Sequence, residues 1–132
     1  MSVFLFFYLQ TGLSMAKKKT ISLFRMIANW FDEAAKTSNV HPELLERIKT
    51  CYSVYHCTFP VKQDDGTQEI IHGWQATFHR NDQPIIGGLR YAMTVNEDEI
   101  LSLAFLTLMQ IALFDLPFGS TFCGIKISKY KS

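Results

Sequence analysis

The sequence has no excess charge of either sign and no hydrophobic run long enough to cross a membrane. Its 13 Lys and Arg residues nearly balance its 12 Asp and Glu residues, for a net charge of +1 and a pI near 7.7. This balance excludes the strongly basic surface of most nucleic-acid-binding proteins. The apolar runs at residues 3–9 and 100–114 fall short of the ~20 residues of a membrane helix. We therefore expect neither nucleic acid nor a membrane as a partner.

Cysteine is also scarce, with only Cys51, Cys57 and Cys123 and no zinc-binding spacing. Cys51 and Cys57 fall in one predicted strand, which puts them roughly 20 Å apart and out of disulfide range. The sequence therefore predicts free thiols in a reducing compartment. Cys123, in a glycine-bearing turn, is a candidate nucleophile, but no histidine is near it in sequence and nothing there activates a thiolate.

Nucleotide and metal motifs are missing as well. There is no G-x-G-x-x-G motif, so the chain lacks a dinucleotide-binding unit. The stretch from Gly119 to Gly124 is not a phosphate loop, because Ile125 stands where Lys is required and Lys126 is one place late. No metal spacing links the four histidines, which are His41, His56, His72 and His79. The acidic pairs at residues 64–65 and 98–99 are expected to form a turn and to begin a helix.

What is present suits one compact α/β domain of 132 residues, 48% of them hydrophobic. We expect residues 1–20 to be a disordered or spurious tail, with Met15 as an alternative start to Met1, and residues 21–132 to form the domain. Helical spacing of apolar residues predicts a helix over residues 21–36. Pro42 at a first helical position predicts a second helix to Lys49.

Strand patterns follow at residues 52–61 and 69–79, separated by Asp64-Asp65-Gly66, which is a hairpin signal. A further strand is predicted at residues 85–91, where Gly87-Gly88 indicates a bend or a close backbone approach. Thr94 or Asn96 can cap a helix over residues 100–114, predicted to be buried on most sides and packed on the sheet. The last strand is predicted at residues 124–127. The fold class is thus N-terminal helices, a β-hairpin and a mixed sheet with a buried helix on it, without a Rossmann domain.

Four segments in this order resemble the N-terminal domain of glutamate dehydrogenases, over about a hundred residues. Residues 59–66 (FPVKQDDG) and 71–76 (IHGWQA) are similar to the family's FP-(I/V)-x-x-DDG and G-(Y/F)-R-A-Q-H hairpin. Residues 84–91 (PIIGGLRY) resemble P-x-K-G-G-(I/L)-R-(Y/W/F). Residues 96–104 follow the helix V-x-x-D-E-V-x-A-L-A, and residues 115–119 (DLPFG) resemble D-(L/V)-P-(Y/F)-G-G. The likeness is greatest to the hexameric type.

The resemblance implies a domain that binds substrate and forms oligomers, with NAD or NADP held by a separate Rossmann domain. In the family two lysines hold the substrate carboxylates and a third activates water. The corresponding positions here are Ile86 and Gln110 for the anchors and Phe122 for the catalytic lysine. Arg90 and Asp115 are retained. We therefore expect no intact catalytic residue, no cofactor site and no metal site in this chain.

Three hypotheses follow from this pattern. The first is a truncated pseudoenzyme subunit that forms homo-oligomers or mixed oligomers with a full-length glutamate dehydrogenase, or a gene fragment without function. The second is a module whose apolar cleft, lined by Ile86 and Phe122, binds a small molecule. The third is an active fragment completed by another chain. The resemblance implies the mitochondrial matrix or the cytoplasm.

Overall fold

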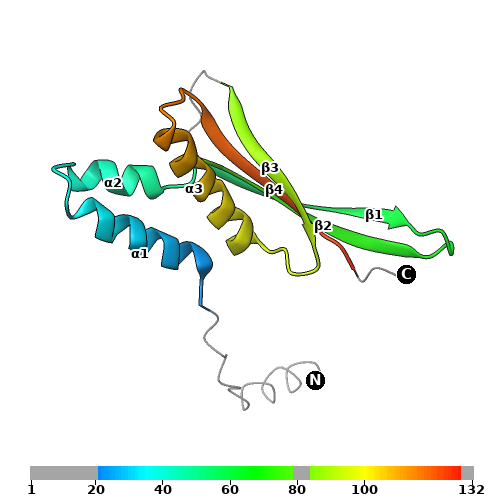
Figure 1. Ribbon diagram of the computed structural model, residues 1–132. Coiled ribbons are helices and arrows are strands. Elements are labelled where there is room, and N and C mark those ends of the chain that lie inside the picture. The colour runs from blue at the N-terminus through cyan, green and yellow to red at the C-terminus, as the bar shows by residue number, and fades with distance from the viewer. Residues whose placement is uncertain (1–20, 79–83, 129–132) are drawn as a thin grey trace, which may run out of the picture.

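The computed structural model describes residues 21–78 and 84–128, so the expected tail at residues 1–20 and His79 lie outside the described residues. In chain order the elements are α1 (Leu23–Ala35), α2 (Pro42–Lys49), β1 (Ser53–Lys62), β2 (Gln68–Phe78), β3 (Ile85–Ala92), α3 (Glu97–Leu113) and β4 (Gly119–Lys126). The predicted α/β class, with a mixed sheet and helices, is confirmed (Figure 1).

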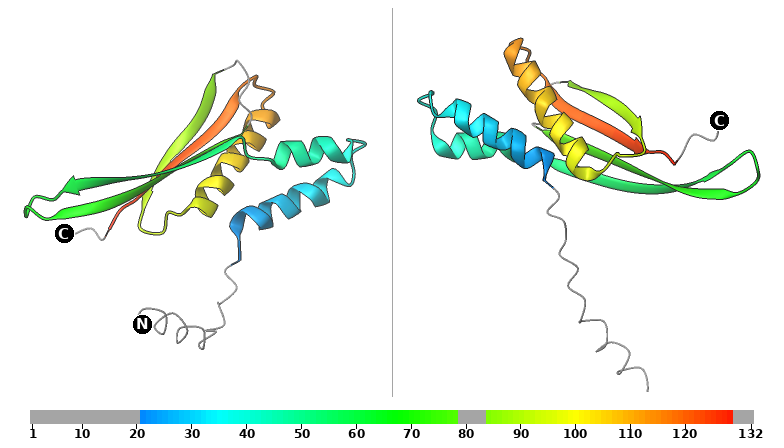
Figure 2. Two further views of the ribbon diagram at one scale, coloured as in Figure 1. Left: turned by 180° about the vertical axis from the view of Figure 1, so that it is seen from behind. Right: turned by 60° about the horizontal axis from the view of Figure 1, so that its bottom comes forward.

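The four strands form one sheet in the order β1-β2-β4-β3. β2 pairs antiparallel with both β1 and β4, whereas β3 and β4 are parallel. A parallel pair needs a crossover, and α3 provides it between β3 and β4. β1 and β3 are therefore the edges of the sheet, and the β1–β2 hairpin projects beyond the helices (Figures 1 and 2).

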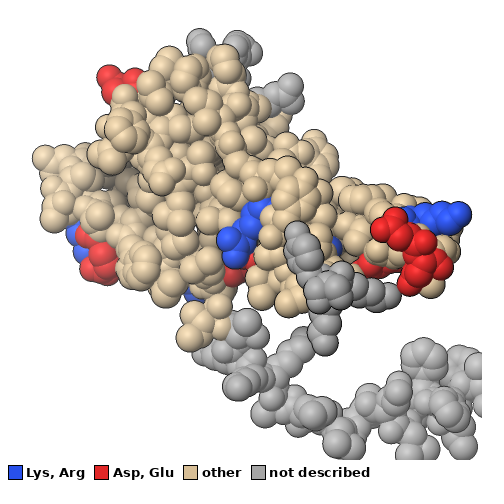
Figure 3. All heavy atoms as spheres, turned by 45° about the vertical axis from the view of Figure 1, so that its right-hand side comes forward, with Lys and Arg blue, Asp and Glu red and all other residues tan. Residues whose placement is uncertain are grey.

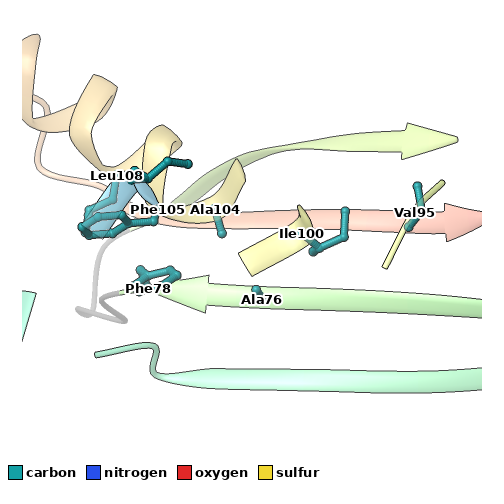
Figure 4. Close-up of a cluster of buried hydrophobic side chains, with 8 residues drawn as sticks. Ala76, Phe78, Val95, Ile100, Ala104, Phe105 and Leu108 are labelled. Carbon is teal, nitrogen blue, oxygen red and sulfur yellow. The ribbon is translucent and has the colours of Figure 1, made fainter. Parts of the chain in front are cut away.

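The core lies where α3 and α1 cover one face of β2 and β4 (Figure 4). Phe78 and Phe105 are fully buried, and Phe24 and Phe31 of α1 meet the ring of Phe105 edge-on at centroid distances of 5.6 and 5.7 Å. Aromatic pairs of this geometry add to the stabilisation from burial. The other fully buried apolar side chains are those of Ala76, Val95, Ile100 and Ala104.

The starts of α1 and α3 are joined by one carboxylate. Asp98, in the first turn of α3, accepts hydrogen bonds from the Leu23 backbone N–H and from the Ser22 hydroxyl, both at 2.6 Å. Ser22 in turn caps α1 by accepting from the Arg25 N–H, as N-cap residues do. Of the two predicted caps for α3 it is Asn96 that acts, accepting from the Glu99 N–H at 3.0 Å.

The hairpin prediction is confirmed, with Gly66 at φ 84° in the turn. Two strand predictions are wrong. The last strand spans Gly119–Lys126 rather than residues 124–127, because the sequence between the two glycines pairs with β2 on one side and β3 on the other. Cys123 therefore lies in a strand and not in a turn. Cys51 precedes β1 instead of sharing it with Cys57.

The prediction that this helix is buried on most sides and packed on the sheet is confirmed for α3, which contacts β2, β4 and α1. It begins at Glu97, and its buried residues include Ile100, Phe105 and Ile111, all on the side facing the sheet and α1. Leu113 is 81% exposed at its outer end. An almost wholly apolar helix carries no periodic signal, so its sequence could not show which side is covered. No helix in the described part of the chain is long and apolar enough to span a bilayer.

Candidate functional site

The predicted site residues of the sheet lie on its helix-covered side. The strand registers place Phe122 in a row with Ala76 of β2 and Gly88 of β3. Ile86 belongs to the next row, beside Ser120, and is 41% exposed. Phe122 and Ile86 are therefore diagonal neighbours on adjacent strands, near the edge formed by β3.

The Phe122 ring lies directly over Gly88. A Cβ added to Gly88 would come within 2.7 Å of Phe122 Cε2, and the same ring packs against the core. The small residues Ala76 and Gly88 on either side thus accommodate a large aromatic side chain. The aromatic ring of Phe122 therefore makes apolar a position at which the family resemblance led us to expect the ammonium group of a lysine.

Gly87 is required by the neighbouring strand. Its added Cβ would fall 1.8 Å from the Thr121 carbonyl oxygen, which no side chain can accommodate. The sequence prediction that backbone approaches closely at Gly87-Gly88 is confirmed. The reason is the packing of β3 against β4, where Gly87 meets the Thr121 backbone and Gly88 meets the Phe122 ring.

Arg90 makes a structural contact in this chain. Its Nε donates to Glu99 Oε1 at 2.8 Å, which ties the edge strand β3 to the first turn of α3. Glu99 is only 18% exposed, whereas Arg90 is 46% exposed. The guanidinium is thus committed to a carboxylate of the same domain.

Asp115 ends α3 with backbone geometry. It takes φ 52°, its N–H donates to the Ala112 carbonyl, and the Leu116 N–H donates to the Ile111 carbonyl. These two bonds form a Schellman motif, with Asp115 at the position that glycine usually occupies. Gln110 lies on the exposed side of α3, and no hydrogen bond joins its side chain to Asp115, Ile86 or Phe122 among the contacts of the described residues.

The other face of the sheet is a second candidate surface, which no sequence motif indicated. Alternate residues of all four strands point to it, and no described helix covers it (Figure 2). We call it the open face, defined by Tyr55, Phe59, Val61, Ile71, Ile85, Leu89, Tyr91, Cys123 and Ile125. Tyr55, Leu89 and Tyr91 are each more than half exposed. The sequence contained a signal for this face, because β1 and β3 carry apolar residues at both odd and even positions and so on both sides of the sheet.

Charged side chains of the described surface lie mainly on α1 and α2, at the start of α3 and in the hairpin turn. Figure 3 shows one group of charged side chains at the far end of the β1–β2 hairpin and others scattered over the rest of this face. A hollow in the surface lies at the helix starts and is lined by Ile21, Ser22, Leu23, Thr94, Asn96, Asp98 and Glu99. It is separate from Ile86 and Phe122, and its central carboxylate, Asp98, is already bonded to α1.

Two of the thiols, those of Cys51 and Cys123, have a raised pKa. Burial raises the pKa of Cys51, and burial followed by the nearby Cys57 raises the pKa of Cys123. A raised pKa lowers the thiolate fraction at neutral pH, which opposes nucleophilic catalysis. Cys51, Cys57 and Cys123 form no disulfide with one another in the structure. No group of three or more potential metal ligands occurs in the described ranges.

Residues 52–132 match the family model described as Glu/Leu/Phe/Val dehydrogenase, dimerisation domain. The mitochondrial glutamate dehydrogenase of Dictyostelium discoideum is 33% identical over 77% of this chain and 20% of its own length. The NAD-specific glutamate dehydrogenase A of Halobacterium salinarum is 34% identical over 72% and 22%. The NADP-specific enzyme of Synechocystis sp. is 33% identical over 81% and 25%. The chain thus spans a fifth to a quarter of the length of these relatives.

Solved structures agree with these matches. The hetero-hexameric glutamate dehydrogenase of Thermus thermophilus, in a leucine-bound form, superposes with a TM-score of 0.76 at 27% identity, covering 86% of this chain and 27% of that one. The glutamate dehydrogenase of Peptoniphilus asaccharolyticus gives a TM-score of 0.77 at 25% identity, covering 85% and 28%. The element order and topology described above are therefore those of a known domain.

Proposed function

Because the chain belongs to the Glu/Leu/Phe/Val dehydrogenase family, through its dimerisation domain, we propose that it serves as an oligomer-forming subunit without dehydrogenase activity of its own. The observation that carries this proposal is the open face, an apolar sheet surface left without a helical layer. Its partner is a second copy of the chain or a full-length glutamate dehydrogenase. The two parts of the proposal, assembly and inactivity, have separate supports.

The inactivity rests on the residues at the three lysine positions. Ile86 and Phe122 are apolar and lie on one face of the sheet, and Gln110 carries no charge. Loss of one positioned acid or base typically costs about 10²–10⁴-fold in rate. Loss of two cationic anchors also removes the orientation of a dicarboxylate substrate. The retained residues do not replace them, since Arg90 is paired with Glu99 and Asp115 forms a helix terminus.

The residues present do not fit a nicotinamide cofactor. A dinucleotide site needs a glycine-rich turn between a strand and a helix, so that the helix N-terminus receives the pyrophosphate. Gly119 and Gly124 both belong to β4, which follows α3 and leads into no helix within the described residues. The names of relatives include both NAD-specific and NADP-specific enzymes, so this cofactor chemistry belongs to their longer chains.

The assembly rests on exposed apolar area. Contiguous apolar surface of this kind marks interaction sites in soluble proteins. On the open face the registers align Tyr55, Gln75, Cys123 and Leu89 across all four strands, with Tyr91 in the next row. A surface with a polar residue, Gln75, among apolar ones suits packing against a similar surface. We place the protein in a reducing compartment, the mitochondrial matrix or the cytoplasm.

Co-expression with a full-length glutamate dehydrogenase, followed by native mass spectrometry, tests the assembly. We expect homo-oligomers or mixed oligomers with the intact chain, and Leu89→Asp should abolish both by placing a charge on the open face. Leu44→Asp is the matched control, because Leu44 on α2 has a similar exposure, 49% against 53%, away from the sheet. A monomeric chain that never enters the intact enzyme would overturn the proposal.

The inactivity is tested separately, by following reduction of NAD or NADP with glutamate and the purified chain. We expect no reduction above the blank, and none after the combined change Ile86→Lys, Gln110→Lys and Phe122→Lys. Measurable reduction by the unmodified chain would disprove this part of the proposal while leaving the assembly result intact.

A further inference from the structure

Two histidines and a tryptophan form a partly exposed cluster on the hairpin that the proposed function does not use. His56 of β1 and Trp74 of β2 are direct cross-strand partners, and His72 lies two residues away along β2 on the same face. His56 Nε2 and His72 Nδ1 are 3.1 Å apart. Their approach was not predicted from the sequence, because the two histidines are 16 residues apart and show no metal-binding spacing.

We propose that His56 and His72 form a two-ligand binding site for a transition-metal ion, of the class of Ni²⁺, Cu²⁺ or Zn²⁺. Imidazole nitrogen is a preferred ligand for these ions. Two nitrogens bound to one ion at about 2.0–2.1 Å lie roughly 2.9–3.4 Å apart for bond angles between 90° and 109°. The observed separation of 3.1 Å falls inside that range.

The neighbouring indole holds the site in position. The rings of His56 and Trp74 are stacked with centroids 4.8 Å apart and an angle of 2° between their planes. Trp74 is half-buried, so it fixes the plane of the His56 ring, and His56 itself is exposed to solvent. A ligand held in orientation before binding loses less conformational entropy when the metal arrives.

In the metal-free protein one histidine donates a ring N–H to the other. On metal binding that proton would move to the second nitrogen of its own ring, and the ion would bind between the two facing nitrogens. Coordination requires both facing nitrogens to be unprotonated, which a neutral imidazole provides by changing its tautomer. The remaining coordination positions would be filled by water, because the described residues supply no third ligand. The site is therefore open and exchangeable, unlike a structural metal site with four protein ligands.

One nearby charge opposes the cation. Lys126 of β4 is the cross-strand partner of His72 on the same face and is exposed. Arg90, in the same row as His56, is neutralised by Glu99. Lys126→Gln should therefore strengthen binding, by about two- to five-fold for an exposed charge at this range.

Trp74 provides the test, because a paramagnetic ion bound to His56 quenches the fluorescence of the indole stacked on that ring. The chain has two tryptophans, so Trp30→Phe leaves Trp74 as the single reporter. Ni²⁺ is the probe, since Cu²⁺ would oxidise the free thiols. We expect saturable quenching at one ion per chain, with His56→Ala and His72→Ala each weakening binding by about 10–100-fold or more.

Two variants serve as controls for the other metal-binding groups. His41→Ala removes an exposed histidine that precedes α2, and Cys57→Ser removes the thiol of an exposed residue of β1. Both variants should leave the titration unchanged. Circular dichroism checks that each variant is folded. Absence of saturable quenching, or quenching that survives in both His56→Ala and His72→Ala, would overturn the proposal and leave the pair as a hydrogen bond only.

Discussion

The two faces of the sheet differ in what completes them. On the helix-covered face the side chains of Ala76 and Phe78 are fully buried by residues of the same chain. On the open face Tyr55 and Leu89, which belong to one cross-strand row, are 64% and 53% exposed. Both faces are built from apolar and aromatic residues, so composition does not distinguish them. The difference shows that one face is covered within the domain, whereas the other is the surface at which we propose that a partner binds.

The largest expected effect separates the two faces by substitution. Phe105→Ala removes a fully buried ring that Phe24, Phe31 and Phe78 contact, and should lower the free energy of unfolding by about 3–5 kcal/mol. Tyr55→Ala should change it by about 0.5 kcal/mol or less in dilute, monomeric protein. Urea denaturation measures both. A greater loss from Tyr55→Ala at low protein concentration would contradict the assignment of the faces.

A smaller effect is expected where β3 joins the central strand. Gly87→Ala should destabilise the chain by about 1–3 kcal/mol, because the new methyl group would collide with the Thr121 carbonyl. Amide hydrogen exchange should show faster opening of β3 than of β2. Gly66→Ala is the control with free space around it, where only the backbone at φ 84° opposes the side chain, at a cost of about 1 kcal/mol. Equal exchange in β2 and β3 would argue against the collision.

The terminus of α3 offers a stabilising change. Asp115→Gly should raise the free energy of unfolding by about 0.5–1 kcal/mol, because glycine adopts φ 52° without the steric penalty of an L side chain. Lys36→Gly at the end of α1 should give no such gain, since Lys36 has φ −59°. Thermal unfolding compares the two. A destabilised Asp115→Gly variant would mean that the carboxylate has a role beyond the backbone turn.

The smallest expected effect concerns α2, which has no fully buried residue and contacts the rest of the domain through Ile48 and Lys49. Lys49 Nζ donates to Asp32 of α1 at 2.7 Å and to Glu46 at 2.6 Å, and these hydrogen bonds raise its pKa above 10.5. A raised folded pKa stabilises the fold fully below the unfolded value, and this contribution is lost as the pH rises through the folded value.

Lys49→Met should therefore lower the free energy of unfolding at pH 8, by less than about 1 kcal/mol because Asp32 and Glu46 are largely solvated. The difference from the unmodified chain should shrink when both are unfolded in urea at pH 11.5. A difference that stays constant between these pH values would show that Lys49 acts through packing of its methylene groups.

Local signals in the sequence predicted most elements of the fold. Three of these signals act only on residues close to them in the chain, so they can be read from the sequence alone. They are Pro42 at the first position of α2, Asn96 at the cap of α3 and Gly66 in the hairpin turn. β4 was predicted too short, since glycines at both ends of the segment suggested a turn. Its strand conformation comes from pairing with β2 and β3, which are remote in sequence.

The candidate site divides in the same way. The sequence identified Ile86, Gln110 and Phe122 at positions where the resemblance led us to expect lysine. It could not show that Phe122 packs over Gly88, or that Arg90 binds Glu99, because each contact depends on the register of β3 and on the place where α3 crosses the sheet. The His56–His72 contact likewise requires the hairpin register.

By itself, then, the sequence determined the domain class, the order of the helices and strands, the family resemblance and the uncharged residues at the three lysine positions. Only the tertiary structure decided which face of the sheet is covered. Alternating apolar residues make both sides of a strand fit for burial, and one layer of helices can cover only one of them. The helices are held on one face by two contacts between residues far apart in the chain. Asp98 joins the starts of α1 and α3, and the ring of Phe78 packs against that of Phe105.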